Sequence, residues 1–208
     1  MVRSRRSQSG KRRSRFRKLR LQLRSRFTRL LLAISALFAV LLIAWLIKAY
    51  LRAEEAQRYT VVGEPSISAE FINQVLDKYH SPAAGKGQAL YDDGVKYGID
   101  PVFALAFFMH ESRFGTTGVA TVTRSLGNIR ATPGYARYQG YRRYHRWEDG
   151  FEDWYRLIAK LYVAQWGLST VDQIVPVYAP GSDNNDVEAY IAAVKQAVDT
   201  WRSGSLEV

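Results

Sequence analysis

The fold of this chain is decided by residues 100–115, which read Asp100-Pro-Val-Phe-Ala-Leu-Ala-Phe-Phe-Met-His-Glu-Ser-Arg-Phe-Gly115. Asp is a favoured N-cap residue, and proline fits the first helical position because no amide hydrogen is needed there. The pattern predicts an almost entirely apolar helix over Val102–Glu111, and Gly115 marks its end.

Glu111 has the most unusual surroundings of any carboxylate in the sequence. Phe107 and Phe108 lie four and three positions before it, on the same helical face. Glu111 also lies at the C-terminal end of the predicted helix, where the helix dipole is negative. Burial and the dipole both favour the protonated carboxyl, which is the form that a general acid needs near neutral pH. These residues alone are equally consistent with a solvated Glu in a last helical turn.

Helices are also predicted on both sides of this segment, with Ser68 as the first cap and Asn185 or Asp186 as the last. The apolar spacing predicts them over residues 68–79, 89–97, 151–161 and 186–201. Residues 112–146 are rich in Gly, Thr, Tyr and Arg and lack helical periodicity, so they are expected to form loops or a small β-hairpin. The sequence therefore predicts one mainly α domain over residues 67–208.

An apolar run, Leu30–Ile47, contains eighteen residues with Ser35 as its only polar member. As a helix it would be about 27 Å long, close to the thickness of a bilayer core. A buried core helix is rarely apolar on every face, and a signal peptide has a shorter run followed by a small-residue cleavage site, whereas Lys48 follows here. We expect one uncleaved transmembrane helix.

The positive charge of the chain is concentrated before this run. Of 30 Lys and Arg residues, 13 lie within residues 1–29, which leaves 17 basic and 19 acidic residues, a formal charge of −2, for residues 30–208. Binding of nucleic acid by the folded part is therefore not expected. By the positive-inside rule the N-terminus is cytoplasmic and everything after the helix lies outside. Residues 1–29 are expected to be a disordered basic tail, and residues 48–66 a spacer.

Common metal-binding motifs are absent from the sequence. His110-Glu111 begins like the zinc-protease motif H-E-x-x-H, but Phe114 stands where the second His is required. His80 and His145 are far from His110 in the sequence, and the chain has no Cys, which excludes disulfides and thiolate zinc sites. We expect neither a metal nor another cofactor.

Four blocks of sequence follow one another along the chain. They are Phe103-Ala-Leu-Ala-Phe-Phe-Met-His-Glu-Ser-Arg-Phe-Gly115, Ser125-Leu-Gly-Asn-Ile-Arg130, Tyr141-Arg-Arg-Tyr-His-Arg-Trp-Glu-Asp-Gly-Phe-Glu-Asp-Trp154 and Val177-Tyr-Ala-Pro-Gly-Ser-Asp-Asn-Asn-Asp186. Together, over residues 68–201, they resemble the bacterial endo-β-N-acetylglucosaminidase family (mannosyl-glycoprotein endo-β-N-acetylglucosaminidase-like), which includes autolysins and flagellar muramidase-like enzymes. The resemblance implies a lysozyme-like domain with a small loop or hairpin lobe that hydrolyses β-1,4 bonds in peptidoglycan glycan strands. Together with the predicted transmembrane helix, it leads us to expect this domain outside a bacterial cell membrane.

The resemblance also implies roles for single residues. Glu111 matches the Glu of the family's E-S-x-x-G block and is the implied general acid, and Tyr178 matches the Tyr of its Y-A-x-D block and is implied to line the cleft. Soluble lytic transglycosylases, a related lysozyme-like group, have a Gly-Leu-Met-Gln-type segment where this chain has Gly127-Asn-Ile-Arg130. Both groups cut peptidoglycan glycan, so the substrate class is common to them, while the bond cut and the product end stay open.

Residues 112–147 hold seven arginines, five aromatic side chains from residue 135 onward, and no acid. Aromatic rings can stack on sugar faces and guanidinium groups pair with carboxylates, so this stretch suits an anionic glycan. We expect Asn128, Arg130, Tyr144 and Trp147 to bind substrate. The tyrosines and arginines are equally consistent with ordinary cross-strand packing in a hairpin.

A second carboxylate, the usual requirement for glycoside hydrolysis, is missing from that stretch. Glu148, Asp149 or Asp183 could supply it, or the substrate's own 2-acetamido group could be the nucleophile while Glu111 serves as acid and then as base. We slightly favour the substrate-assisted route, and the choice stays open. Asp183 also fits a simple turn residue. The missing carboxylate leaves two other functions open, a catalytically silent glycan-binding or division-scaffold module and a lytic transglycosylase.

Overall fold

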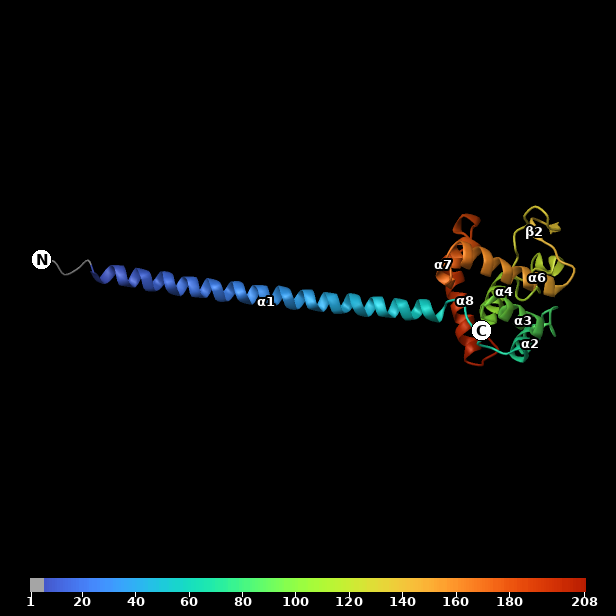
Figure 1. Cartoon of the computed structure of the whole chain (residues 1–208), viewed down its shortest axis with the longest axis horizontal. Helices are drawn as coiled ribbons and strands as arrows, with labels where there is room; N and C mark the ends of the chain where they lie inside the picture. The colour runs from blue at the N-terminus through green and yellow to red at the C-terminus, as the bar shows by residue number, and fades with distance from the viewer. Residues whose placement is uncertain (1–5) are drawn as a thin grey trace. The chain divides into compact units, whose positions relative to one another are not determined.

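The computed structural model describes residues 6–208, with side chains from residue 27 onward. The backbone divides into two compact units between residues 55 and 56. The first unit consists of most of one long helix, α1 (Arg6–Arg58) (Figure 1). Its part Phe27–Arg58 is 32 residues long, exposed, and apolar enough to cross a membrane.

The structure differs from the sequence-based expectation on both sides of the apolar run. Residues 6–29, expected to be disordered, are helical, and residues 1–5 of that tail lie outside the described residues. Arg, Lys, Leu and Gln are good helix formers, and lengthening an existing helix needs no new nucleus. The expected spacer over 48–66 is helical to Arg58, and Tyr59 and Val61 beyond it are buried in the core of the second unit. The segment thus continues α1 to Arg58 and then enters the core of the second unit.

The second unit is mainly helical, as the sequence predicts. Its elements after α1 are α2 (Ala69–Lys78), α3 (Gly87–Tyr97), α4 (Pro101–Ser112), α5 (Ala120–Thr123), β1 (Arg137–Tyr138), β2 (Tyr141–Arg142), α6 (Trp147–Arg156), the π-helical segment η1 (Leu157–Gln165), α7 (Val171–Tyr178), the 3-10 turn η2 (Gly181–Asp183) and α8 (Val187–Arg202). The ends of α2, α3, α4 and α8 agree with the predicted ones to within two residues. Helices α2 and α8 carry apolar spacing and side-chain caps at Ser68 and Asp186, α4 begins at the Asp100 cap, and α3 ends at Gly98, which explains the agreement.

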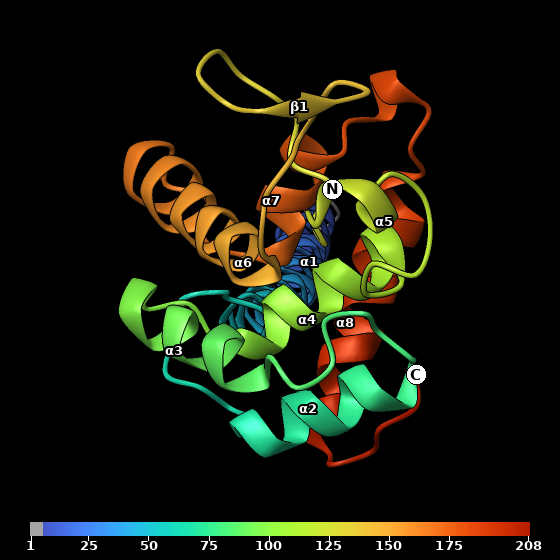
Figure 2. The ribbon, with the colours of Figure 1, turned by 90° about the vertical axis from the view of Figure 1, so that its right-hand side faces the viewer.

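Helix α4 lies among the other helices of the domain and contacts α3 and α8 (Figure 2). All residues of Pro101–Phe108 are buried, as expected for a helix that is apolar on every face. Asp100 caps it as predicted, accepting a hydrogen bond from the Val102 amide at 3.2 Å. The same carboxylate accepts from the Ser66 amide at 3.0 Å and pairs with Arg202 Nη2 at 2.9 Å. The cap therefore also ties α8 and the chain before α2 to the central helix.

The predicted hairpin is present as the antiparallel pair β1 and β2. Both residues of its two-residue turn have positive φ, 47° and 83°, as a type I′ turn requires. Asp153 of α6 holds the base of the hairpin, because its buried carboxylate accepts hydrogen bonds from Arg142 Nη1 at 2.7 Å and from the Tyr144 hydroxyl. The small lobe is thus fixed to the helical part of the domain by one buried acid.

Candidate active site

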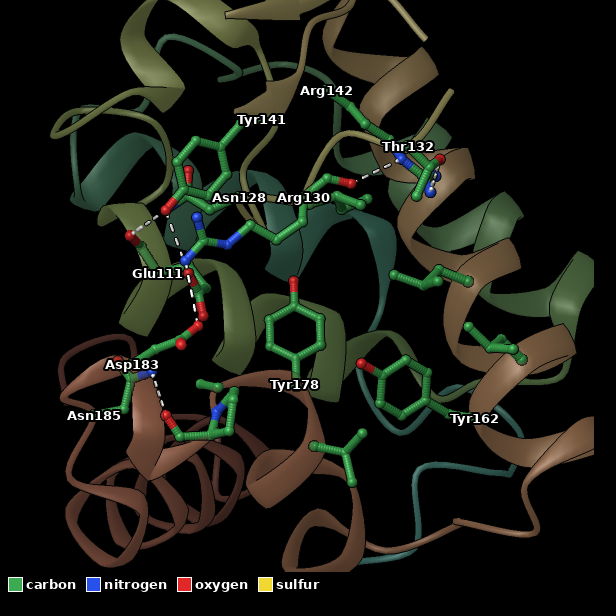
Figure 3. Close-up of a pocket in the computed structure, with 16 residues that line it drawn as sticks. Glu111, Asn128, Arg130, Thr132, Tyr141, Arg142, Tyr162, Tyr178, Asp183 and Asn185 are labelled. Carbon is green, nitrogen blue, oxygen red and sulfur yellow. Dashed lines mark hydrogen bonds and ion pairs between the residues drawn. The ribbon is translucent and has the colours of Figure 1, made fainter. Parts of the chain in front are cut away.

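A groove with a volume of about 480 Å³ lies where the C-terminal end of α4 meets the hairpin lobe, η1 and the end of α7 (Figure 3). Five of the predicted site residues line it, namely Glu111, Asn128, Arg130, Tyr178 and Asp183. They come from four separate segments of the chain, so their meeting is a property of the tertiary structure.

Glu111 occupies the second-last position of α4, and its half-buried side chain faces the groove. The Tyr190 hydroxyl donates a hydrogen bond to Glu111 Oε1 at 2.7 Å, and Asn128 Nδ2 donates to Oε2 at 3.3 Å. Burial raises the pKa of Glu111, while these two hydrogen bonds and the charge of Arg130 offset part of the increase. The raised pKa keeps a larger share of the carboxyl protonated near neutral pH than in a solvated Glu.

Asn128 is held tightly beside Glu111. Its φ of 47° lies in the left-handed region, which Asn adopts more readily than most residues. In this conformation its Nδ2 also donates to the Glu111 carbonyl oxygen at 2.8 Å, so it binds both the main chain and the side chain of that residue. Asn128 therefore orients the Glu111 carboxyl and satisfies a carbonyl oxygen in the last turn of α4.

Tyr178 forms the floor of the groove at the end of α7, between Glu111 and Tyr162 in the view of Figure 3. Its ring packs edge-on against Phe107 with the ring centres 5.3 Å apart, and its hydroxyl donates to the Gly127 carbonyl. A Cβ on Gly127 would lie 2.8 Å from that hydroxyl and 2.6 Å from Trp154 Cδ1, so only glycine fits there. Tyr178 is therefore fixed in place by α4, Gly127 and Trp154 and lines the groove.

The π-helical segment η1 forms an apolar wall of the groove. Leu157, Leu161 and Tyr162 of this segment line it. π-Helical turns are rare and occur frequently at functional sites, because the extra residue per turn redirects the side chains that follow. The wall gives the groove an apolar side opposite the polar groups around Glu111.

Arg130 and Asp183 face each other across the groove, one from the loop before the hairpin and the other from η2. Arg130 Nη2 lies 3.4 Å from Asp183 Oδ2, and the Arg130 guanidinium lies 4.8 Å from the centre of the Tyr141 ring. Both charged side chains are largely exposed, 67% and 48% respectively. This is a long, solvated ion pair, which contributes little to stability.

Four predicted site residues do not line the groove. The Tyr144 hydroxyl donates a hydrogen bond to Asp153. The Trp147 ring packs against Gly115, where an added Cβ would lie 2.9 Å from the ring. Both side chains are therefore structural. Glu148 pairs with Lys86 at 2.7 Å, and Asp149 closes a capping box with Arg146 at the start of α6. These four side chains therefore do not line the groove: Tyr144 is held by Asp153, and the other three, which lie at the start of α6, contact other partners. Of the three candidates for a second carboxylate, Asp183 alone is among the lining residues.

Tyr190, Tyr162 and Asp153 were not predicted as site residues. Tyr190 is 2% exposed, follows the α8 cap by four residues, and in the sequence resembles any other core position of that helix. Its ring also stacks on His110 with the centres 3.7 Å apart. The one available signal was chemical, since a buried tyrosine hydroxyl needs a hydrogen-bond partner.

The groups in the groove define the chemistry it can perform. A half-buried carboxyl with a raised pKa can protonate a leaving oxygen, and the surrounding aromatic and guanidinium groups can hold a sugar that carries negative charge. Among residues 27–208, whose side chains the structure describes, no cluster of three or more His, Cys, Asp or Glu side chains is placed to hold a metal ion. No known family model matches the chain, and no curated protein shows significant similarity to it.

Proposed function

We propose that this chain is a membrane-anchored peptidoglycan hydrolase that cleaves β-1,4 glycosidic bonds of the glycan strands, with Glu111 as the general acid. The observation that carries the proposal is the half-buried Glu111 carboxyl, which has a raised pKa and opens onto a groove. Each of the four sequence blocks that resemble the endo-β-N-acetylglucosaminidase family contributes residues to this groove. If the resemblance were accidental and involved only structural residues, we would not expect the matching residues to lie around one groove.

In the first step, the protonated Glu111 carboxyl donates its proton to the oxygen of the departing sugar. The carboxylate that remains keeps its hydrogen bonds from Tyr190 and Asn128, which become stronger when their acceptor is charged. In the second step, Glu111 acts as the base that removes a proton from the attacking water. Both steps need the carboxyl in one orientation, and these two donors provide it.

The nucleophile of the first step is the substrate's own 2-acetamido oxygen, which attacks the anomeric carbon and forms a cyclic intermediate. Asp183 is the other carboxylate that lines the groove, but its side chain is 48% exposed and already faces Arg130. A solvated, paired carboxylate is a weak nucleophile in comparison. Asp183→Asn should therefore retain most of the cleavage activity, whereas loss comparable to that in Glu111→Gln would assign the nucleophile to Asp183.

The proposed position in the cell rests on α1. Its exposed apolar part is long enough to span a membrane, and the basic residues before it favour the cytoplasmic side. The groove is then outside the membrane, where peptidoglycan lies.

The test is the incubation of the full chain in detergent with purified peptidoglycan, followed by mass spectrometry of the released fragments. Hydrolysis adds one water for each bond cut, whereas intramolecular attack, as in lytic transglycosylases, adds none. The proposal expects fragments that carry the added water. If the chain binds peptidoglycan and releases no fragments, the silent glycan-binding module is the correct function.

A further inference from the structure

The side chain of Arg130 is held differently from those of Arg142 and Arg146. Arg142 is buried against Asp153 at 2.7 Å, and Arg146 contacts Asp149 at 2.5 Å within the same helix start. Arg130 has its backbone fixed, since its carbonyl accepts from Arg142 Nε at 3.2 Å, but its guanidinium reaches Asp183 only at 3.4 Å. A fixed main chain with an exchangeable charged tip is the arrangement expected of a ligand-binding arginine.

In the groove, the Arg130 guanidinium lies near Glu111, the proposed acid. Arg130 and Glu111 line the same groove, and Arg130 is close enough for its charge to act on Glu111 (Figure 3). The Arg130 guanidinium carbon also lies 4.8 Å from the centre of the Tyr141 ring. A guanidinium can contact an aromatic ring with its face and still bind a carboxylate through its N–H groups. The exposed Asp183 carboxylate is the group that faces these N–H groups in the free protein.

We infer that Arg130 is a specificity-determining residue that binds a carboxylate carried by the glycan next to the bond that is cut. When the groove is empty, the Asp183 carboxylate occupies the position of this substrate carboxylate. The inference rests on the proposed function and deepens it. In a strand where only alternate sugars carry a carboxylate, such a contact fixes the register of the strand against Glu111. Arg130 thereby decides which of the two alternating bonds is cleaved.

Electrostatics link this recognition to the acid. The positive charge of Arg130 offsets part of the burial-induced increase in the pKa of Glu111. In the free protein the Asp183 carboxylate already faces Arg130, so a bound substrate carboxylate replaces one negative partner of Arg130 by another and leaves the proton of Glu111 in place. Asp183, at the far side of the groove, is then released to solvent.

The test compares the full chain and Arg130→Gln on peptidoglycan strands before and after amidation of their carboxyl groups. Wild type should lose at least about tenfold in kcat/KM on amidated strands, and Arg130→Gln should show this loss already on native strands and little further loss on amidated ones. Arg130→Gln should also release fragments ending in either sugar, where wild type releases one kind. Lys160→Gln is the control, because it removes one exposed positive charge from η1 outside the groove.

The outcomes separate the inference from the proposed function. If wild type does not cleave native strands, the proposed function fails and the inference fails with it. If wild type cleaves native and amidated strands equally, or Arg130→Gln keeps the wild-type rate and product ends, only the inference is overturned. Thermal unfolding of Arg130→Gln and partial recovery of kcat/KM in Arg130→Lys distinguish lost recognition from lost folding. A misfolded variant would also fall below wild type on amidated strands, whereas a variant that has lost only the recognition would match wild type there.

Discussion

The hydroxyl oxygen of Tyr190 lies 2.7 Å from Oε1 of Glu111, although 79 positions separate the two residues in the chain. Helix α8 carries Tyr190 and α4 carries Glu111, and these helices contact each other along the centre of the domain. The contact therefore couples the orientation and the pKa of the proposed acid to the packing of the last helix.

Replacement of Glu111 by Gln should abolish cleavage while leaving the fold intact. Gln keeps the size and most hydrogen bonds of Glu but cannot donate the proton, so the rate of peptidoglycan cleavage should fall by at least about 10²–10⁴-fold. Glu70→Gln, an exposed change on α2, is the matched control and should retain the wild-type rate. Wild-type cleavage by Glu111→Gln would falsify the assignment of the acid.

Tyr190→Phe should shift the pH dependence of cleavage without abolishing it. The Tyr190 hydroxyl stabilises the ionised form of Glu111, so its removal raises the pKa of Glu111 further. Because the acid must be protonated, activity is lost as pH rises through this pKa, and the alkaline limb of the kcat/KM profile should move to higher pH. Tyr91→Phe on α3 is the control. An unshifted limb in Tyr190→Phe would show that the hydrogen bond does not act on the catalytic group.

Asp153→Asn should destabilise the domain by about 3–5 kcal/mol, because it leaves the buried Arg142 guanidinium without its counter-charge. Burial alone would raise the pKa of Asp153, but hydrogen bonds from Tyr144 and Arg142 outweigh it and hold the pKa below its usual value. The carboxylate therefore stabilises the fold above its unfolded pKa, and this contribution disappears as pH falls through the folded one.

Urea unfolding at several pH values tests the role of Asp153. The gap in unfolding free energy between wild type and Asp153→Asn should be largest near neutral pH and should narrow in acid. Asp149→Asn, which removes an exposed pair with Arg146, should have a much smaller effect. Equal effects of the two changes would mean that Asp153 does not anchor the hairpin.

Asp93→Asn should stabilise the domain at pH 8. Burial, followed by repulsion from Glu152, raises the pKa of Asp93 to about 6. Above that pH the ionised carboxylate lowers the free energy of unfolding. A raised pKa means that stability is greatest below the unfolded value and declines as pH rises towards 6. For a half-buried group the gain from Asn should be about 1 kcal/mol at pH 8, and it should vanish near pH 4. Thermal melts at both pH values, with the exposed Asp77→Asn as control, measure this difference.

Protease added outside spheroplasts should remove the domain and leave a small protected N-terminal fragment. The reason is the excess of positive charge before the apolar run, which favours a cytoplasmic N-terminus. Protection of the whole chain would reverse the orientation, and release of the domain without protease would indicate a cleaved signal peptide.

Local chemistry explains which parts of the fold were predictable. The Asp100 cap, the apolar residues after it and the hairpin position depend on neighbours within a few residues, so α4 and the place of Glu111 at its end follow from the sequence. Helix α7 is not among the predicted helices, although Thr170 and Gln173 form a capping box at its start. Pro176 lies inside it, and proline is unfavourable in a helix interior.

The sequence by itself determined that a mainly α domain follows one apolar helix in the chain. It also determined that Glu111 lies at the end of a second apolar helix, within this domain. The tertiary structure alone decided the partners of that carboxylate, the pairing of Arg130 with Asp183, and the removal of Tyr144 and Trp147 from the site. The physical reason is that caps and periodicity act over one or two turns, whereas a groove arises where packed helices end. Which side chains meet there depends on the distances set by the whole core.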